Sequence, residues 1–215
     1  MLREEAYERF KQRLFSRKLR PGQFVSQRAL AVLVGSSEGP MREALKRLEA
    51  ESLVRLVPQR GIQIADINVA FIQNSFGLRL ALESFAVRRF ALTRDKLECR
   101  RFTAIFTDIA ERIRAHPTPK LLDGALAVDR DFHRSIVGSL GNTVIDEVYR
   151  LNDDKIRLIR LNSRFTADRI ASATAEHLAI LAALEAGDAE GAAAALERHL
   201  AISLRRSLGV LDPPP

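Results

Sequence analysis

The N-terminal fold is decided by residues 26–65, which read SQRALAVLVGSSEGPMREALKRLEAESLVRLVPQRGIQIA. Ser26 is a good helix N-cap, and the stretch after it, Gln27–Val34, places apolar side chains at helical spacing. Gly35 ends this helix, and a second helix is expected to begin shortly after it and run to about Glu51. Two helices that meet across a tight glycine turn are typical of a helix-turn-helix motif.

The sequence on either side extends this motif. Residues 4–17 carry apolar side chains on one helical face, which predicts a preceding helix. Two β-rich stretches, Leu53–Val57 and Ile62–Ala65, flank a segment with Pro, Arg and Gly that favours a hairpin turn. The order helix, helix, turn, helix, hairpin predicts a winged helix-turn-helix domain over residues 1–66.

Beyond residue 66 the pattern changes to long amphipathic helices without strand-like alternation. The fold class is therefore mostly α, with an N-terminal winged helix-turn-helix and a C-terminal all-α six-helix bundle over residues 67–210. Residues 211–215, rich in proline, are expected to be a disordered tail. The breaks between helices fall at segments with proline or glycine. The six predicted helices span residues 68–92, 94–115, 119–139, 143–164, 168–186 and 189–208.

The net charge of +7 is unevenly distributed. Residues 1–66 contain 13 Lys and Arg against 8 Asp and Glu, whereas the rest contains 21 against 19. A positive field on a small domain suits a partner with a phosphate backbone. A basic, solvated surface without a partner is the alternative, and charge by itself does not separate the two.

Neither a membrane segment nor an export signal is predicted. No stretch approaches the ~18 uninterrupted apolar residues of a membrane span, and the N-terminus lacks the apolar core of a signal peptide. Cys99 is the single cysteine, so it cannot form an intrachain disulfide. We therefore expect a cytoplasmic protein with no membrane partner.

Three of the four histidines fall in a pattern that metal sites use. Asp129 and His133 are four residues apart and share one face of a predicted helix. His177 and His199 are equally far from the turn between the last two helices, so an antiparallel hairpin would let them face each other. One carboxylate and three imidazoles can bind Zn²⁺, Ni²⁺ or Mn²⁺ and leave positions open for water or a ligand.

Each of these residues also has an ordinary structural interpretation. An Asp and a His four residues apart can form a surface salt bridge, and a buried histidine can serve only as a hydrogen-bonding group. The symmetric placement of His177 and His199 makes the metal site as well supported as these alternatives, and both stay open at this point.

Taken together, the motifs resemble the GntR family, in the branch with an FCD-type (FadR/VanR-like) helical effector domain. The resemblance covers nearly the whole chain, and its order and spacing are specific. In the N-terminal part it rests on Leu19–Gly22, Arg28–Ala31, Pro40–Glu49, Leu53-Val54 and Gly61. In the helical part it rests on Arg79–Glu83, Asp129–His133, Gly141-Asn142, Glu176-His177 and His199.

This resemblance implies a homodimeric transcription regulator, usually a repressor, that binds a roughly palindromic operator in double-stranded DNA. A small organic acid would bind the effector domain and change operator affinity. The resemblance also supports a divalent metal ion, zinc before nickel or manganese, because Asp129, His133, His177 and His199 each fall on a ligand position of the family.

One segment departs from the family pattern. The family opens its recognition helix with Ser-Arg-Thr-Pro or a close variant, whereas this chain has Ser37-Glu38-Gly39-Pro40. Glu38 would repel phosphate, although it could accept a hydrogen bond from a cytosine amino group. Either the operator sequence differs or binding is weakened; alternatively, Glu38 points to solvent and only one contact is lost.

The resemblance assigns specific roles on DNA. Arg42, one turn into the recognition helix, could reach base edges, or it could pair with Glu38 or Glu49. Lys46 and Arg28 suit phosphate contacts, and the wing tip would enter a minor groove or lie on phosphate. The predicted DNA-contacting residues are Arg28, Ser37, Glu38, Arg42, Lys46, Arg60 and Gly61.

The effector is expected near the metal ion, where Arg79 could pair with a carboxylate or could instead form an intrahelical ion pair with Glu83. Two other functions stay open at this point. In one, the metal ion is itself the signal; in the other, the protein is a metal-dependent hydrolase. We expect no enzyme, because no glutamate is placed as a general base and no nucleophile motif is present.

Overall fold

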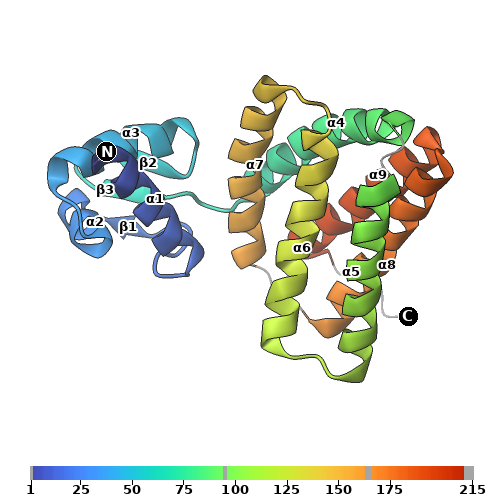
Figure 1. Ribbon diagram of the computed structural model, residues 1–215. Coiled ribbons are helices and arrows are strands. Elements are labelled where there is room, and N and C mark those ends of the chain that lie inside the picture. The colour runs from blue at the N-terminus through green and yellow to red at the C-terminus, as the bar shows by residue number, and fades with distance from the viewer. Residues whose placement is uncertain (1, 94–95, 163–165, 211–215) are drawn as a thin grey trace. The chain divides into compact units, whose positions relative to one another are not determined.

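The computed structural model describes residues 2–93, 96–162 and 166–210. It divides into two compact units, the first with residues 1–72 and 153–163, the second with residues 73–152 and 164–215 (Figure 1). The two ranges of the first unit include the winged part and the end of a later helix, α7 (Thr143–Leu161).

Three helices and a small sheet form the N-terminal part of the first unit. The predicted winged helix-turn-helix order is confirmed, and the boundaries differ from those predicted by only a few residues. The elements are α1 (Leu2–Phe15), β1 (Phe24–Val25), α2 (Gln27–Val34), α3 (Glu38–Ala50), β2 (Val54–Val57) and β3 (Gly61–Ile64).

The turn between α2 and α3 has the local contacts that the sequence suggested. Ser26 caps α2 by accepting a hydrogen bond at its Oγ from the backbone N–H of Ala29, at 3.1 Å. Gly35 ends α2 with a φ of 65°, a left-handed conformation that glycine adopts without steric cost. Arg9 of α1 donates to the carbonyl of Gly35 at 3.2 Å, so α1 also fixes this turn.

The sheet contains one strand that the sequence pattern did not predict. Its order is β1-β3-β2, with both pairs antiparallel, and Phe24 of β1 lies opposite Gln63 of β3. A two-residue strand is too short to show alternation, so only the neighbouring strand reveals it. Beneath the sheet and the three helices lies an apolar core that includes the fully buried Phe10, Leu45 and Ile64.

The second part of the chain is entirely helical in its described residues, as predicted. The six helices confirm the predicted number and follow the predicted boundaries closely. They are α4 (Val69–Thr93), α5 (Lys96–Ala115), α6 (Pro119–Gly138), α7 (Thr143–Leu161), α8 (Ala167–Ala186) and α9 (Ala189–Ser207). The predicted disordered tail, residues 211–215, lies outside the described residues.

Aromatic rings from two helices form the centre of the second unit's core. The ring of Phe132 on α6 meets those of Phe102 and Phe106 on α5 edge to face, at centroid distances of 5.2 and 5.5 Å. Burial of each such ring stabilises the fold by about 1.5–3 kcal/mol, and edge-to-face pairing adds to this. This core fixes α6, from which two of the candidate metal ligands project.

The hairpin of α8 and α9 is fixed by its turn. Gly187 ends α8 with a φ of 73°, and Asp188 caps α9 by accepting from the backbone N–H of Gly191 at 2.8 Å. Helices joined by so short a connection pack side by side in opposite directions, as α8 and α9 do in Figure 1. Residues at equal distances from the turn therefore lie at the same height.

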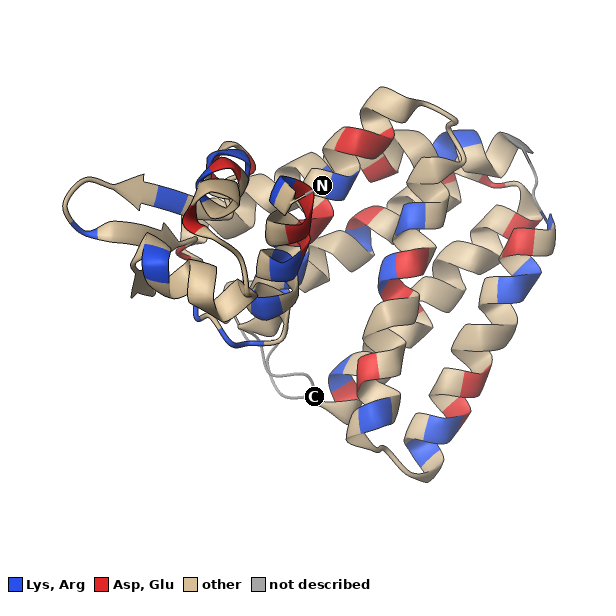
Figure 2. Ribbon diagram, turned by 60° about the vertical axis from the view of Figure 1, so that its left-hand side comes forward, with Lys and Arg blue, Asp and Glu red and all other residues tan. Residues whose placement is uncertain are grey.

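Lys and Arg outnumber Asp and Glu in residues 1–66 but nearly balance them in the rest of the chain. Figure 2 shows Lys and Arg on the hairpin of the N-terminal part, and both signs of charge interspersed along the helices of both parts. Among the described helices, none combines the length and the apolar character that crossing a membrane requires.

Candidate functional site

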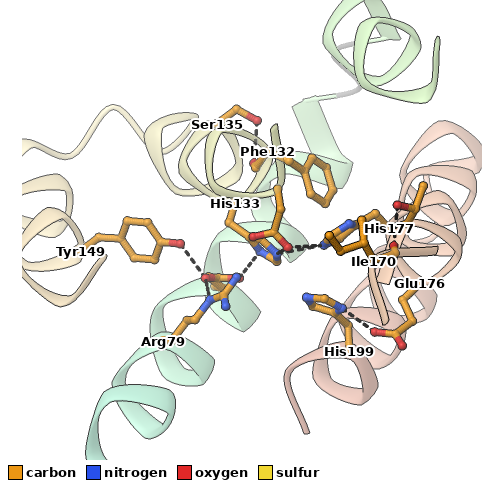
Figure 3. Close-up of polar contacts among 12 residues, drawn as sticks. Arg79, Phe132, His133, Ser135, Tyr149, Ile170, Glu176, His177 and His199 are labelled. Atoms are coloured by element: carbon orange, nitrogen blue, oxygen red, sulfur yellow. Dashed lines mark hydrogen bonds and ion pairs between the residues drawn. The ribbon is translucent and has the colours of Figure 1, made fainter. Parts of the chain in front are cut away.

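Four side chains from three helices of the second unit converge in its interior. Asp129 and His133 come from α6, His177 from α8 and His199 from α9, and all four are buried. One potential ligand atom from each lies within 4.8 Å of the others (Figure 3). The structure thus brings together all four residues that the sequence singled out for a metal site.

Helix geometry accounts for this convergence. Asp129 and His133 are one helical turn apart on the buried face of α6. The rings of His177 and His199 lie at a centroid distance of 4.4 Å because the α8–α9 hairpin places them at the same height. The ring of His177 also stacks on Phe106 at 4.7 Å, so the aromatic core determines how this imidazole is oriented.

Hydrogen bonds determine which nitrogens of two imidazoles face the cluster. Nδ1 of His133 lies 2.7 Å from Oε2 of Glu83, and Nδ1 of His199 lies 2.7 Å from Oε2 of Glu176. An ionised carboxylate only accepts, so each Nδ1 carries the proton and each Nε2 keeps its lone pair. Nε2 of His199 is buried and has no hydrogen-bond partner among the described residues, which fits a site for a cation.

Burial keeps these imidazoles neutral at pH 7. Burial, together with the nearby guanidinium of Arg79, lowers the pKa of His133 to about 4 against the opposing effect of Glu83. Burial also lowers the pKa of His199 well below its usual value, as do the neighbouring His177 and His133. Neutral imidazoles can donate a lone pair to a metal ion without first losing a proton.

Arg79 and Glu83 form the ion pair that the sequence offered as the alternative role of Arg79. Nε of Arg79 donates to Oε1 of Glu83 at 2.6 Å, and the hydroxyl of Tyr149 donates to the same oxygen at 2.7 Å. Burial would raise the pKa of Glu83, but the charge of Arg79, with further contributions from His133 and the hydrogen bond from Tyr149, outweighs it and lowers that pKa to about 2. Glu83 therefore connects the candidate ligand His133 to a buried arginine and to α7.

The helix-turn-helix exposes most of the residues predicted to contact DNA. Arg28, Arg42 and Lys46 are all exposed, and Lys46 forms an ion pair with Glu43 at 2.8 Å. In the described part of the chain, no ion pair joins Arg42 to Glu38 or Glu49. An exposed arginine without such a partner remains available for DNA.

The unusual residues at the start of α3, Glu38 and Gly39, are exposed. Ser37 is the N-cap, but its side chain makes no capping hydrogen bond, and Glu38 is the exposed first residue of the helix. Nε2 of Gln27 on α2 donates to the carbonyl of Glu38 at 3.2 Å, which ties the two helices together. The exposed Glu38 thus adds a negative charge to the N-terminal end of α3.

Two family models together match most of the chain. The model described as bacterial regulatory proteins of the gntR family matches residues 2–64, and that of the FCD domain matches residues 74–202. The chain belongs to the GntR family. As a GntR regulator with an FCD domain, it is a DNA-binding transcription regulator and not an enzyme, so the hydrolase alternative is dropped.

Curated relatives and solved structures are similar to this chain over much of its length. The HTH-type transcriptional repressor RspR of Escherichia coli strain K12 is 25% identical over 184 residues, covering 84% of this chain and 77% of RspR. A GntR transcriptional regulator from Rhodococcus sp. RHA1 has the same fold, with a TM-score of 0.78 and 21% identity, covering 98% of this chain and 99% of that one. The Zn²⁺-bound FCD domain of TM0439 has a TM-score of 0.57 and 20% identity, covering 67% of this chain and 96% of that domain.

In the wing of this GntR regulator, the side chain of Arg60 contacts β1, the strand that the sequence pattern did not predict. The guanidinium of Arg60 lies over the ring of Phe24 in β1, 4.3 Å from its centroid. Gly61 has a φ of 93°, and a Cβ there would lie 3.0 Å from the carbonyl oxygen of Val25. Glycine is therefore required at this position by the backbone, before any contact with DNA is considered.

The sequence predicts the four candidate metal ligands of the GntR regulator, but it does not predict the roles of the residues that hydrogen-bond to these ligands or to their partners. The sequence predicts Glu83 only as a partner of Arg79, and it indicates Glu176 only as part of a motif. A carboxylate four residues after Arg79 was the one signal for Glu83, whereas nothing in the local sequence pointed to Tyr149.

Proposed function

We propose that this GntR regulator is a repressor whose operator affinity is set by a small organic acid bound beside a divalent metal ion. The observation that carries this proposal is the buried cluster of Asp129, His133, His177 and His199. In this cluster the neutral imidazoles of His133 and His199 direct their Nε2 lone pairs inward, because their Nδ1 atoms face carboxylates. Such a donor set suits a divalent ion of intermediate softness.

Zinc is the ion we propose first, with nickel and manganese as alternatives. Imidazole nitrogen and carboxylate oxygen are common zinc ligands. The Zn²⁺-bound state of the FCD domain of TM0439, which has a related fold, supports this choice. When bound, the ion would supply positive charge and a coordination position to which a carboxylate could bind.

Arg79 supports a carboxylate as the effector. Its side chain is buried, its Nε is occupied by Glu83, and its Nη1 has no hydrogen-bond partner within the described residues. Glu83, which pairs with Arg79, also lies 2.7 Å from Nδ1 of His133, so Arg79 is close to the cluster (Figure 3). A buried N–H without a partner costs free energy, so an acceptor that reaches it would bind favourably.

On the DNA side, we propose that two copies of the chain form a homodimer whose winged domains read the half-sites of an approximately palindromic operator. The proposed division is residues 1–66 for DNA binding and residues 67–210 for metal and effector. The protein would act in the cytoplasm, where its operator is. The proposed DNA-contacting residues are Arg28, Ser37, Glu38, Arg42, Lys46, Arg60 and Gly61.

Binding of the purified protein to the DNA that flanks its own gene tests this proposal. Binding should be selective for sequence, weaken with salt, and be relieved by one member of a panel of small carboxylates. The variant His199→Ala should lose the response to that carboxylate, whereas His116→Ala, which changes an exposed loop histidine, should keep it. Binding that no carboxylate alters, with or without zinc, would contradict the proposed effector.

A second candidate function is that the metal ion is itself the signal. Four protein donors can complete a tetrahedral zinc site and leave no position for an effector, and this observation favours the alternative. Titration with zinc in the absence of any organic acid separates the two functions. A large change in operator affinity on zinc binding would favour the metal-responsive regulator; a change in thermal stability without a change in operator affinity would contradict it.

A further inference from the structure

Each of two imidazoles in the cluster has a carboxylate behind it. Oε2 of Glu83 lies 2.7 Å from Nδ1 of His133, and Oε2 of Glu176 lies 2.7 Å from Nδ1 of His199. A neutral imidazole has a single N–H, so a proton held on Nδ1 leaves Nε2 as a lone pair. In metal sites, such contacts fix both the tautomer and the orientation of the ligand ring.

The two carboxylates are held in different ways. Glu83 is fully buried, and its other oxygen accepts from Arg79 and Tyr149 at 2.6 and 2.7 Å. Glu176 comes directly before His177 on α8, has a side chain 18% exposed, and lies 3.8 Å from Nη1 of Arg206. Replacing Glu176 therefore removes a partly exposed charge, whereas replacing Glu83 disturbs a fully buried ion pair.

His177 has no such carboxylate. Its Nδ1 is buried and has no hydrogen-bond partner in the part of the chain that the structure describes. Its Nε2 lies 3.3 Å from Oδ1 of Asp129 and 3.2 Å from Nε2 of His133. Without an ion, the favourable place for the proton of His177 is Nε2, from which it can donate to Asp129.

We propose that Glu83 and Glu176 are positioning residues that hold His133 and His199 as Nδ1–H tautomers, so that their Nε2 lone pairs are ready for the ion. The proton of His177 then moves from Nε2 to Nδ1 when the ion binds, and no proton is released by this change. The inference rests on the metal site of the proposed function, but its claim about the metal-free protein can be tested without an ion.

The experiment compares the full-length wild type with Glu176→Ala, Glu176→Gln and Glu185→Ala. Glu185 is exposed on the same helix, so its variant is a matched control. Long-range ¹H–¹⁵N NMR of the imidazoles reports the tautomers of the metal-free proteins, and competition with a chelator reports zinc affinity. We expect Nδ1–H at His133 and His199 and Nε2–H at His177 in the metal-free wild type, and Nδ1–H at all three with zinc.

The Glu176 variants should change both the tautomer of His199 and the zinc affinity, which a purely structural role of Glu176 would not predict. Glu176→Ala should convert His199 to a mixture of tautomers and weaken zinc binding by about 10- to 100-fold. Glu176→Gln keeps an oxygen that can accept from Nδ1, so it should restore the tautomer and part of the affinity. Unchanged tautomer and affinity in Glu176→Ala would overturn the role of Glu176.

Glu83 is tested by Glu83→Gln, supported by Tyr149→Phe in case the first variant does not fold. Tyr149→Phe removes one hydrogen bond from Glu83 and leaves the charge, so the His133 tautomer should persist with a smaller loss of zinc affinity. A folded Glu83→Gln with the wild-type His133 tautomer and zinc affinity would overturn the role of Glu83. Failure of the wild type to bind zinc at all would reject the proposed metal site, while the tautomers of the metal-free protein would still decide the hydrogen-bonding roles of both carboxylates.

Discussion

The Nε2 atoms of His133 and His177 lie 3.2 Å apart in a buried site, although they belong to different helices. Two N–H groups cannot face each other at this distance, so at most one of the two nitrogens carries a proton. Because Glu83 holds the proton of His133 on Nδ1, the lone pair of His133 necessarily points at His177. A cation between the imidazoles would accept the lone pair of His133 and, once His177 carries its proton on Nδ1, that of His177 as well, and this relationship underlies the predictions on metal binding.

Zinc should stabilise the protein, and this stabilisation should require His199. An ion that binds only the folded state at 100 times its dissociation constant contributes about 3 kcal/mol. For a domain of this size, that corresponds to a rise in Tm of about 6–12 °C. Thermal unfolding with zinc and with a chelator should show the difference in the wild type.

The control for this measurement is another histidine. His116→Ala should keep the full difference between the zinc-loaded and the chelated protein, because His116 is exposed and remote from the cluster in sequence. His199→Ala should abolish it. An equal rise in Tm in both variants would show that zinc acts elsewhere on the chain.

Replacing the unusual acidic residue of the recognition helix should strengthen operator binding. Glu38→Arg removes a charge that repels phosphate and adds one that can pair with it, at an exposed helix N-terminus. The salt dependence of binding should steepen by about one unit in the slope of log K against log salt for each subunit. Fluorescence anisotropy at several salt concentrations measures both quantities.

Glu8→Arg on α1 is a matched change in net charge at another exposed position of the N-terminal part. If Glu8→Arg strengthens binding as much as Glu38→Arg does, the gain reflects overall charge and not the position of Glu38. A loss of affinity in Glu38→Arg, confined to the native operator, would instead indicate that Glu38 reads a base.

Arg42 and Lys46 should differ in what their removal changes. Arg42→Ala should cost about 1–3 kcal/mol of binding free energy and reduce discrimination among operator sequences, since an arginine in this part of the helix can reach base edges. Lys46→Ala should weaken binding to all sequences alike and lower the salt slope by about one. Competition with a set of single-base operator variants measures this difference; an identical profile for both variants would contradict it.

Acid should destabilise the metal-free protein in a defined pH range. His133 has a pKa of about 4 in the folded state, against an ordinary value of 6.5, so the unfolded chain takes up the proton first. The free energy of unfolding should therefore fall as the pH decreases from 6.5 to about 4, by about 3 kcal/mol from this group. His199, whose pKa is also lowered, should add to the loss.

Protonation of Glu83 should lower the free energy of unfolding further at still lower pH. Its folded pKa of about 2 lies below the ordinary 4.5, so its stabilising contribution is lost as the pH falls from 4.5 to about 2. Urea unfolding with a chelator present, repeated across the pH range, gives the profile. His116→Ala should leave it unchanged, and an unfolding free energy that stays constant between pH 7 and pH 5 would contradict the buried neutral state of His133.

Much of the fold followed from local signals in the sequence. Ser26 and Gly35 delimit α2 because capping and a left-handed helix end depend on the residues themselves. The turn at Gly187 and Asp188 likewise determined that His177 and His199 would lie at the same height, since equal spacing from a tight turn is enough. These features are readable because each is fixed within a few residues of the chain.

Other features were decided only by tertiary structure. Strand β1 exists because β3 pairs with it, and Arg60 finds the ring of Phe24 through that pairing. Tyr149 meets Glu83 because α7 passes beside α4, and no periodicity within either helix could have selected that partner. The sequence by itself determined the element order and the four candidate ligands. The packing of distant helices determined which nitrogen of each imidazole faces the site, because a tautomer depends on the group that lies behind the ring.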